Sequence, residues 1–120
     1  MARILVCDDS AFLRKQIRDI LAGAGHEIVG EAANGKDAYD KFAVLAPDIV
    51  TMDMMMEPDG HEASKRIIRQ YPKAKIIIIT SLLDDNGEVS ETVRLGGKGF
   101  VAKPVDKSKL LAEVEKVLAG

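Results

Sequence analysis

Short apolar runs alternate with more polar stretches along this chain. The runs are ILVC at 4–7, a half-polar run at 26–32, IVTM at 49–52, KIIIIT at 75–80 and FVA at 100–102. A continuous apolar run of about four to eight residues, bounded by turn signals, is typical of a strand buried on both faces of a parallel sheet. The run at 26–32 is partly polar, which indicates a strand at the edge of that sheet.

The stretches between these runs carry apolar residues at the spacing of amphipathic helices. They predict helices over about residues 10–24, from Asn34-Gly35 to Pro47, over about 61–70 and 85–95, and from about Asp106 onward. The last helix has a firm apolar stripe that includes Leu110, Val114 and Val117. The helix at 85–95 has a weak one, with Val89 and Val93, so we expect it to be the most loosely held element.

Strand and helix signals alternate five times with no linker between them. Such a chain predicts an α/β fold in which right-handed crossovers place helices on both faces of a parallel sheet, as a three-layer (βα)5 sandwich. We expect one domain over residues 1–120, because a chain of this length can bury a core without disulfides or metal. The edge-like second strand fits the sheet order 2-1-3-4-5, which reverses direction between the first and third strands.

Composition and charge exclude several function classes. The net charge of −2, with 17 basic and 19 acidic residues and no long block of one sign, makes nucleic acid an unexpected partner. No stretch has the roughly 20 apolar residues that span a bilayer and no signal-peptide pattern is present, so we expect a cytoplasmic protein without a membrane partner. Cys7, the only cysteine, is interpreted as a buried hydrophobe. His26 and His61 lack a second ligand at metal-binding spacing and are interpreted as surface or helix-start residues.

Polar side chains that could bind a ligand or take part in a reaction follow four of the apolar runs. Asp8 and Asp9 come after the first run, Asp53 follows the third, Thr80 ends the fourth and Lys103 follows the fifth. The carboxyl ends of parallel strands meet at one edge of an open sheet, where ligands bind, so these side chains are expected to form one site. Each residue alone has an ordinary structural explanation, such as an N-cap or a solvated loop residue, but their repetition at successive strand ends favours a site.

The chemistry of this set points to phosphoryl transfer. Three carboxylates in one crevice repel one another, so at neutral pH they hold either protons or a cation. Magnesium suits them, because it is a hard ion that binds one or two carboxylates together with water and phosphate oxygens. Lys103 adds positive charge and Thr80 a hydrogen-bond donor for an incoming phosphoryl group. Since a carboxylate is also a nucleophile toward phosphorus, the set is suited to forming an aspartyl phosphate.

Several segments carry a resemblance to a known family. They are VCDDSAFLRKQIRDIL, PDIVTMD, the Thr80-Ser81 pair and GKGFVAKP. Together they resemble the receiver domain of bacterial and archaeal response regulators, most of all the stand-alone receivers of chemotaxis, over essentially the whole chain. That family has the flavodoxin-like, or CheY-like, fold with the sheet order 2-1-3-4-5, so the order given above is not independent of the resemblance.

The resemblance implies a phosphoacceptor and a metal site. Asp53 would accept the phosphoryl group, and Asp8, Asp9 and Asp53 would hold Mg²⁺ together with the carbonyl oxygen of Met55.

The resemblance also implies catalytic and switch residues. Thr80 and Lys103 would contact the phosphoryl group, with Ser81 as a minor candidate for the role of Thr80. Thr80 and Phe100 would form the switch, in which Phe100 changes rotamer on activation. A cis peptide bond is implied between Lys103 and Pro104.

The implied function is that of a two-component receiver. A histidine kinase would donate the phosphoryl group, and an output surface on the fourth helix, fifth strand and last helix would bind a target such as a flagellar switch component or adaptor. A phosphatase is a further candidate partner. Such a domain promotes its own phosphorylation and dephosphorylation but does not turn over an external substrate. A receiver taken from a longer response regulator would have the same sequence features.

Other function classes fit the residues less well. An aspartate-dependent phosphatase needs a second Asp two residues after the nucleophile, where this chain has Met55. A flavodoxin-like cofactor carrier needs a phosphate-binding loop after the first strand, where Asp8 and Asp9 would repel a phosphate. A degenerate receiver that only binds partners is disfavoured by the intact acidic residues.

The chain departs from the family pattern in two places. In the loop after Asp53, Glu57 takes the usual place of a proline, Pro58 follows it, and Gly60 comes one residue early. These departures indicate that the loop at residues 54–60, which would contribute to metal binding, differs in shape from that of the family. The stretch from Thr80 to Lys103 is also longer than usual, with the extra residue expected among residues 83–87.

Overall fold

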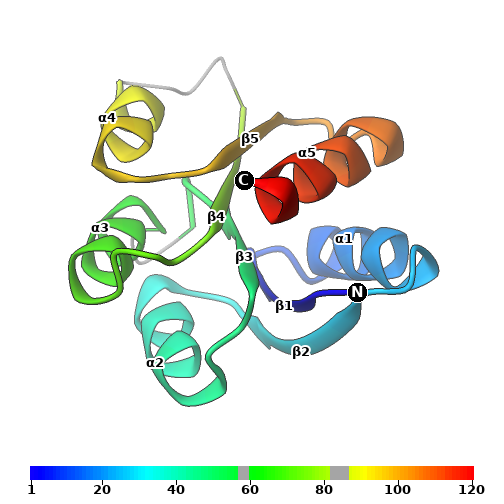
Figure 1. Cartoon of the computed structure of the whole chain (residues 1–120), viewed down its shortest axis with the longest axis horizontal. Helices are drawn as coiled ribbons and strands as arrows, with labels where there is room; N and C mark the ends of the chain where they lie inside the picture. Colours follow the sequence, from blue (N-terminus) through cyan, green and yellow to red (C-terminus); the bar gives the residue numbers. More distant parts are fainter. Residues whose placement is uncertain (57–59, 82–86) are drawn as a thin grey trace.

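Strands and helices alternate along the whole chain, as the sequence predicts. The computed structural model describes residues 1–56, 60–81 and 87–120 (Figure 1). The strands are β1 (Arg3–Cys7), β2 (Glu27–Ala32), β3 (Ile49–Asp53), β4 (Ile76–Thr80) and β5 (Gly99–Ala102). The helices are α1 (Ala11–Gly23), α2 (Gly35–Leu45), α3 (Gly60–Gln70), α4 (Glu88–Leu95) and α5 (Lys107–Ala119).

The strands form one parallel sheet in the order β2-β1-β3-β4-β5, which confirms the predicted order. The half-polar strand β2 lies at an edge, as predicted, and β1 lies between β2 and β3. Asp53 of β3 pairs with Ile79 of β4, and Thr80 of β4 pairs with Ala102 of β5. The carboxyl ends of neighbouring strands are therefore level, so the residues that follow them share one edge of the sheet.

Helices cover both faces of the sheet. Figure 1 shows α1 and α5 on one face and α2, α3 and α4 on the other. On the first face, the buried helix residues of the core are Ile17, Leu21, Leu110, Val114 and Val117. On the second face, they are Ala38, Phe42, Ala63, Ile67 and Ile68. The central strands separate these two cores, which explains why their side chains are apolar at nearly every position.

Side-chain caps explain where several helices begin. The N-caps are Ser10 for α1, Asn34 for α2 and Asp106 for α5. Pro47 was expected to end α2, but the helix ends two residues before it. Ala46 adopts a left-handed conformation, with φ 45°, and donates its N–H to the carbonyl oxygen of Phe42. The α2 terminus is thus a left-handed cap, and Pro47 follows it.

Both histidines are buried, so the prediction of a surface or helix-start position is wrong for His26, whereas His61 is a helix-start residue that is also buried. His26 precedes β2, and its Nδ1 accepts a hydrogen bond of 3.0 Å from the N–H of Ala2. His61 does lie in the first turn of α3, as predicted, but its Nδ1 is 3.0 Å from Oγ1 of Thr92 in α4. In each ring a tertiary partner lies within hydrogen-bond distance of Nδ1, which lowers the cost of burying that nitrogen.

Some of the expected irregularities fall on residues 57–59 and 82–86, which lie outside the described residues. These include Glu57, Pro58 and most of the stretch at 83–87 where the chain is expected to be longer than usual. In α4, the described side chain of Val93 is 47% exposed, in line with the weak apolar stripe predicted for this helix.

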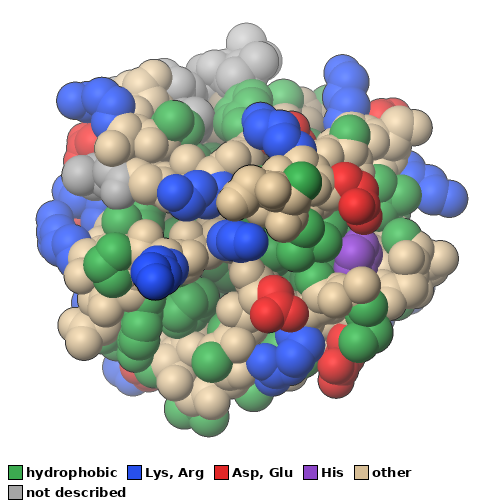
Figure 2. All heavy atoms as spheres, viewed as in Figure 1, with side chains coloured by type: hydrophobic (Ala, Val, Ile, Leu, Met, Phe, Trp, Pro, Cys, Tyr) green, Lys and Arg blue, Asp and Glu red, His purple; other side chains and the backbone are tan. Residues whose placement is uncertain are grey.

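The surface carries both signs of charge. Figure 2 shows Lys and Arg side chains spread over one face of the molecule, with Asp and Glu side chains among them. In the described part of the chain, no helix has the length and apolar character needed to cross a membrane.

Candidate functional site

Side chains from three strand ends meet at the carboxyl edge of the sheet. Among the described residues, Asp8, Asp9 and Asp53 each bring one carboxylate oxygen to within 4.8 Å of the others. The Lys103 ammonium lies 3.5 Å from Oδ2 of Asp8 and 3.4 Å from Oδ1 of Asp53. The structure therefore brings together the acidic residues and the lysine that the sequence places at successive strand ends.

Asp8 is the most constrained carboxylate of the cluster. Its side chain is buried, and Oδ1 accepts a hydrogen bond of 2.9 Å from the N–H of Ser10. Its Oδ2 is buried and has no hydrogen-bond partner within the described part of the chain. Burial raises the pKa of the Asp8 carboxyl, and the charges of Asp53 and Asp9 add to this, whereas Ser10 and Lys103 oppose it. The Lys103 ammonium lies 3.5 Å from Oδ2, and with two further carboxylates beside it this buried oxygen fits a cation.

Asp53 ends β3 and is nearly fully buried. Its Oδ1 accepts a hydrogen bond of 3.0 Å from the N–H of Met55, which fixes the carboxylate against the turn that follows. The Met55 side chain is 44% exposed beside it. Helix α3 begins against the same backbone, because a Cβ built on Gly60 would lie 2.0 Å from the carbonyl oxygen of Asp53. Only glycine allows this approach.

Thr80 and Lys103 come from neighbouring strands that are tied together at their ends. The N–H of Lys103 donates to the carbonyl oxygen of Thr80 at 2.8 Å, and the Lys103-Pro104 peptide bond is cis, as the resemblance implied. The Thr80 hydroxyl is buried, and its described contact, to the carbonyl oxygen of Ser81, is 3.5 Å long. That distance is long for a hydroxyl donor, so the hydroxyl is weakly held.

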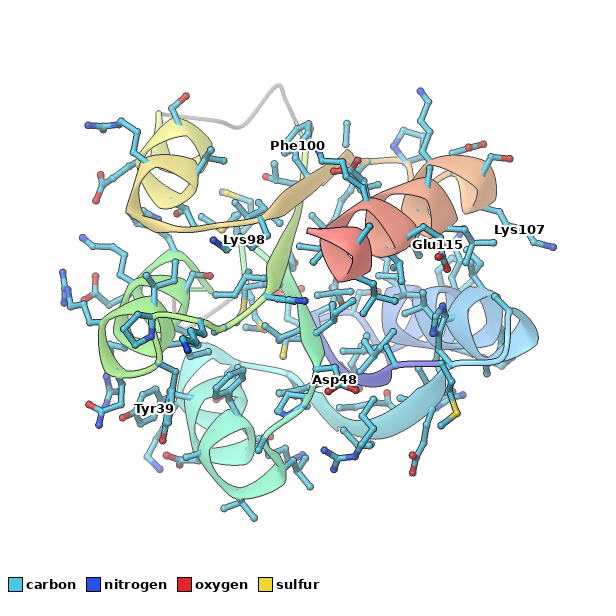
Figure 3. All side chains as sticks on the ribbon, viewed as in Figure 1. Tyr39, Asp48, Lys98, Phe100, Lys107 and Glu115 are labelled. Carbon is cyan, nitrogen blue, oxygen red and sulfur yellow. The ribbon has the colours of Figure 1, made fainter. Side chains whose placement is uncertain are left out.

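Phe100 lies on β5, between α4 and α5 (Figure 3). Its side chain is partly buried and packs against the core on the α3 side of the sheet. Its N–H donates to Oε1 of Glu113 in α5 at 2.8 Å. With Val93, Glu113 and Lys116, Phe100 lines a shallow pocket of about 150 Å³.

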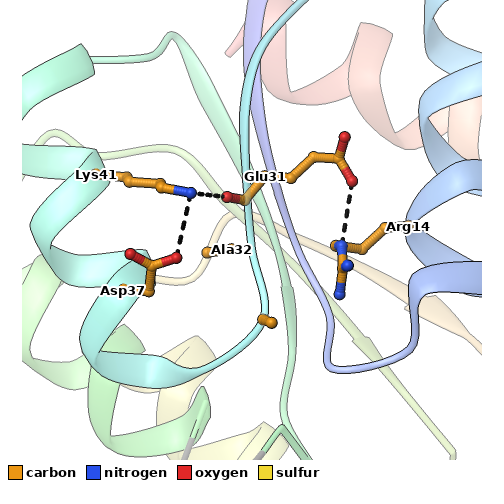
Figure 4. Close-up of a pocket in the computed structure, with 6 residues that line it drawn as sticks. Arg14, Glu31, Ala32, Asp37 and Lys41 are labelled. Carbon is orange, nitrogen blue, oxygen red and sulfur yellow. Dashed lines mark hydrogen bonds and ion pairs between the residues drawn. The ribbon is translucent and has the colours of Figure 1, made fainter.

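Sequence reasoning missed a set of polar contacts on the β2 side of the acidic cluster. Arg14 in α1 donates to the carbonyl oxygen of Asp8 at 2.7 Å and to Oε1 of Glu31 in β2, a contact visible in Figure 4. The other carboxylate oxygen of Glu31 accepts from Arg18. The four-residue spacing of the two arginines on α1 was the available signal, because it indicates a shared partner.

Three carboxylates, one of them with a buried oxygen that accepts no hydrogen bond from the described residues, form a hard oxygen donor set of the kind that Mg²⁺ prefers. The neighbouring ammonium can balance a dianionic phosphoryl group, and Asp53 combines a buried carboxylate with contact to that ammonium. The arrangement is chemically able to bind a cation and to present a carboxylate to a phosphoryl donor.

Sequence comparisons identify the relatives of this chain. The profile of the family described as response regulator receiver domain matches residues 4–115. The chemotaxis protein CheY of Thermotoga maritima is 42% identical over 116 residues, and the match covers 96% of this chain and 96% of that protein.

Solved structures show the same similarity. A chain of the CheX–CheY–BeF3–Mg²⁺ complex from Borrelia burgdorferi matches with a TM-score of 0.90 at 33% identity, over 97% of this chain and 88% of that one. The response regulator domain of Thermotoga maritima CheB matches with a TM-score of 0.89 at 32% identity, over 98% of this chain and 96% of that one.

Proposed function

Because this chain belongs to the response regulator receiver family, the CheY-like switch domains of two-component systems, we propose that Asp53 accepts a phosphoryl group in a Mg²⁺-dependent reaction. The convergence of three carboxylates and Lys103 on one point carries this proposal. Within this set, Asp53 is assigned as the acceptor because it ends β3, the position that the family resemblance gives to the phosphoacceptor, and because its buried carboxylate lies 3.4 Å from the ammonium.

In the proposed reaction, a carboxylate oxygen of Asp53 attacks the phosphorus of a phosphohistidine on a histidine kinase. The new P–O bond forms as the P–N bond breaks, and the departing imidazole nitrogen takes up a proton. Asp8, Asp9 and Asp53, together with the Met55 carbonyl oxygen, would hold Mg²⁺, which would supply positive charge to the phosphoryl oxygens. Lys103 supplies a second positive charge from its position 3.4 Å from Asp53.

The proposed switch begins at Thr80. Its weakly held hydroxyl turns to donate a hydrogen bond to the phosphoryl group, and Phe100 on the neighbouring strand follows into the space that this movement opens. The output surface is formed by α4, β5 and α5, where Val93 is half-exposed and Phe100 lines a shallow pocket. A two-state element of this kind couples the acidic site to a distant binding face.

The proposed target is a protein of chemotaxis or motility, such as a flagellar switch component or an adaptor, with a phosphatase as a further partner. The similarity to chemotaxis CheY over nearly the full length of both chains supports this pathway. The similarity to the receiver of CheB is equally compatible with a receiver that acts within a longer response regulator.

Intact mass measurement after incubation with acetyl phosphate and Mg²⁺ tests the proposal. The expected result is a gain of one phosphoryl group that depends on Mg²⁺ and is lost when the metal is chelated beforehand. A folded chain that gains no mass would overturn the proposal. An aspartate-dependent phosphatase would instead release phosphate from excess substrate without accumulating the phosphorylated chain.

Magnesium is expected to raise the melting temperature. The cation relieves carboxylate repulsion in the folded chain and has no comparable site in the unfolded chain. The unfolding free energy therefore rises by RT ln(1 + [Mg²⁺]/Kd), or about 2.7 kcal/mol at a hundredfold excess over Kd. Asp9→Ala should remove most of this gain. The control is Asp40→Ala, which removes an exposed carboxylate of α2 that pairs with Lys36. Equal magnesium shifts in wild type and Asp9→Ala would contradict the metal site.

Phosphorylation is expected to shift backbone amide resonances mainly in residues 80–102, which run from the end of β4 to β5. The physical reason is the coupled movement of Thr80 and Phe100, which repacks the side of the sheet that α4 covers. Two-dimensional NMR spectra recorded with and without acetyl phosphate measure this. Shifts confined to residues 8–10 and 53–60 would contradict the switch.

A further inference from the structure

The backbone of Asp8 is held on both sides. Its N–H donates to the carbonyl oxygen of Ala32, the last residue of β2, at 3.0 Å. Its carbonyl oxygen accepts from Nη1 of Arg14 at 2.7 Å. Since Ser10 occupies Oδ1, the direction of the remaining oxygen, Oδ2, is set by this fixed backbone.

Arg14 is itself held in place. Its side chain is 19% exposed, and Nε donates to Oε1 of Glu31 at 3.1 Å. The second oxygen of Glu31 accepts from Arg18 at 2.7 Å, so both carboxylate oxygens are engaged. A guanidinium that donates in two directions from one plane, to a carboxylate and to a carbonyl oxygen, has little freedom to rotate.

Glu31 remains charged in this setting. Partial burial opposes ionisation, but hydrogen bonds from Arg18 and Arg14 outweigh it and hold the pKa of the Glu31 carboxyl below its usual value. Its backbone is also fixed, because Lys41 of α2 donates to the Glu31 carbonyl oxygen (Figure 4). Glu31 therefore connects β2, α1 and α2 at the side of the acidic cluster.

The contacts between Arg14 and Glu31 border an open pocket and not the hydrophobic core. The pocket has a volume of about 340 Å³ and is lined by Arg14, Glu31, Ala32, Ala33, Asp37 and Lys41. The Glu31 side chain is 34% exposed. Removing the charge of Glu31 would open no cavity among buried apolar side chains. Stabilisation of the core therefore does not by itself explain the contacts of Glu31 with the arginines.

We propose that Arg14, oriented by Glu31, is a positioning residue for the Mg²⁺ site. By fixing the peptide of Asp8, it holds the Asp8 and Asp9 carboxylates close to Asp53 against their mutual repulsion. The cation then meets a preformed set of oxygens and does not have to order the loop. Groups that orient metal ligands in this way typically change metal affinity by about 10- to 100-fold when they are removed. This inference rests on the proposed function.

The test compares Mg²⁺ affinity with stability. The variants are Arg14→Met, which keeps an apolar stem but removes every donor, and Glu31→Gln, which removes the charge that orients Arg14. The matched controls are Lys15→Met and Asp19→Asn, which remove the partners of an exposed ion pair of 2.7 Å on the same helix. Calorimetric titration gives Kd for Mg²⁺, and thermal unfolding in the presence of a chelator gives stability without metal.

Arg14→Met is expected to raise Kd by about tenfold or more, and Glu31→Gln by a smaller factor. The double variant should bind no more weakly than Arg14→Met, because Glu31 acts through Arg14. Labelling by acetyl phosphate should need more Mg²⁺ in Arg14→Met, with a much smaller change in the maximal rate at saturating metal. The controls should match wild type.

Variants that bind Mg²⁺ like the controls, while wild type binds and becomes labelled, would overturn this inference alone. Additive losses in the double variant would also overturn it, because they would separate Glu31 from Arg14. If Arg14→Met fails to fold, an unchanged Kd in folded Glu31→Gln has the same consequence. Wild type that neither binds Mg²⁺ nor becomes labelled would overturn the proposed function as well.

Discussion

Asp53→Asn is expected to abolish phosphoryl transfer, so that the variant gains no mass from acetyl phosphate and Mg²⁺. An amide is a poor nucleophile toward phosphorus, and the proposed function assigns the acceptor role to Asp53 alone, at the end of β3 and 3.4 Å from the Lys103 ammonium. The amide oxygen can still accept the Met55 hydrogen bond, so the variant should stay folded. Intact mass and circular dichroism measure the two properties.

The control for this prediction is Asp40→Asn, which makes the same carboxylate-to-amide change at an exposed position of α2. It should become labelled like wild type. Labelling of Asp53→Asn at the wild-type rate would show that the phosphoryl group resides elsewhere. Peptide mapping of that product would then identify the true acceptor.

Gly60→Ala is expected to be the most destabilising small substitution near the site. The added Cβ would lie 2.0 Å from the carbonyl oxygen of Asp53 and 3.1 Å from its carbonyl carbon. Both are backbone atoms, so either α3 or the end of β3 has to move. Overpacking of this kind costs about 1–3 kcal/mol of unfolding free energy, and a backbone clash belongs at the upper end. Urea unfolding measures the loss.

The matched control is Gly23→Ala at the end of α1, where an added Cβ meets no described atom within 4 Å. The unfolding free energy of this variant should equal that of wild type or exceed it by up to about 1 kcal/mol, because alanine restricts the unfolded chain. Gly60→Ala should also slow labelling of Asp53, whose backbone it displaces. A variant as stable as wild type would show that α3 can shift freely against β3.

Periodicity predicted the alternation of strands and helices and the common edge, because buried parallel strands and amphipathic helices have different repeats. The sheet order also rested on the family resemblance. The acidic cluster followed from topology alone: once Asp8 and Asp53 are placed at the ends of adjacent strands, they must lie close together. What periodicity cannot supply is the pairing of polar groups from different elements. Arg14 and Glu31 are 17 residues apart, and their contact depends on how α1 crosses the end of β2.

The histidines illustrate the same limit. A lone His61 at a helix start gave no sign of burial, because its partner, Thr92, belongs to a helix that packs beside it only in the folded chain. The left-handed turn at Ala46 was also unpredictable, since alanine has no preference for that conformation and the following Pro47 was the stronger signal.

The sheet order has a consequence for biosynthesis. Asp8, Asp9 and Asp53 are synthesised well before Lys103, which follows β5 at the outer edge of the sheet. Until β5 pairs with β4, the Lys103 ammonium is not held beside the three carboxylates. A nascent chain or a fragment that ends before β5 therefore carries Asp53 but not the complete site. Under the proposed function, competence for phosphoryl transfer is therefore expected only after the last strand has joined the sheet.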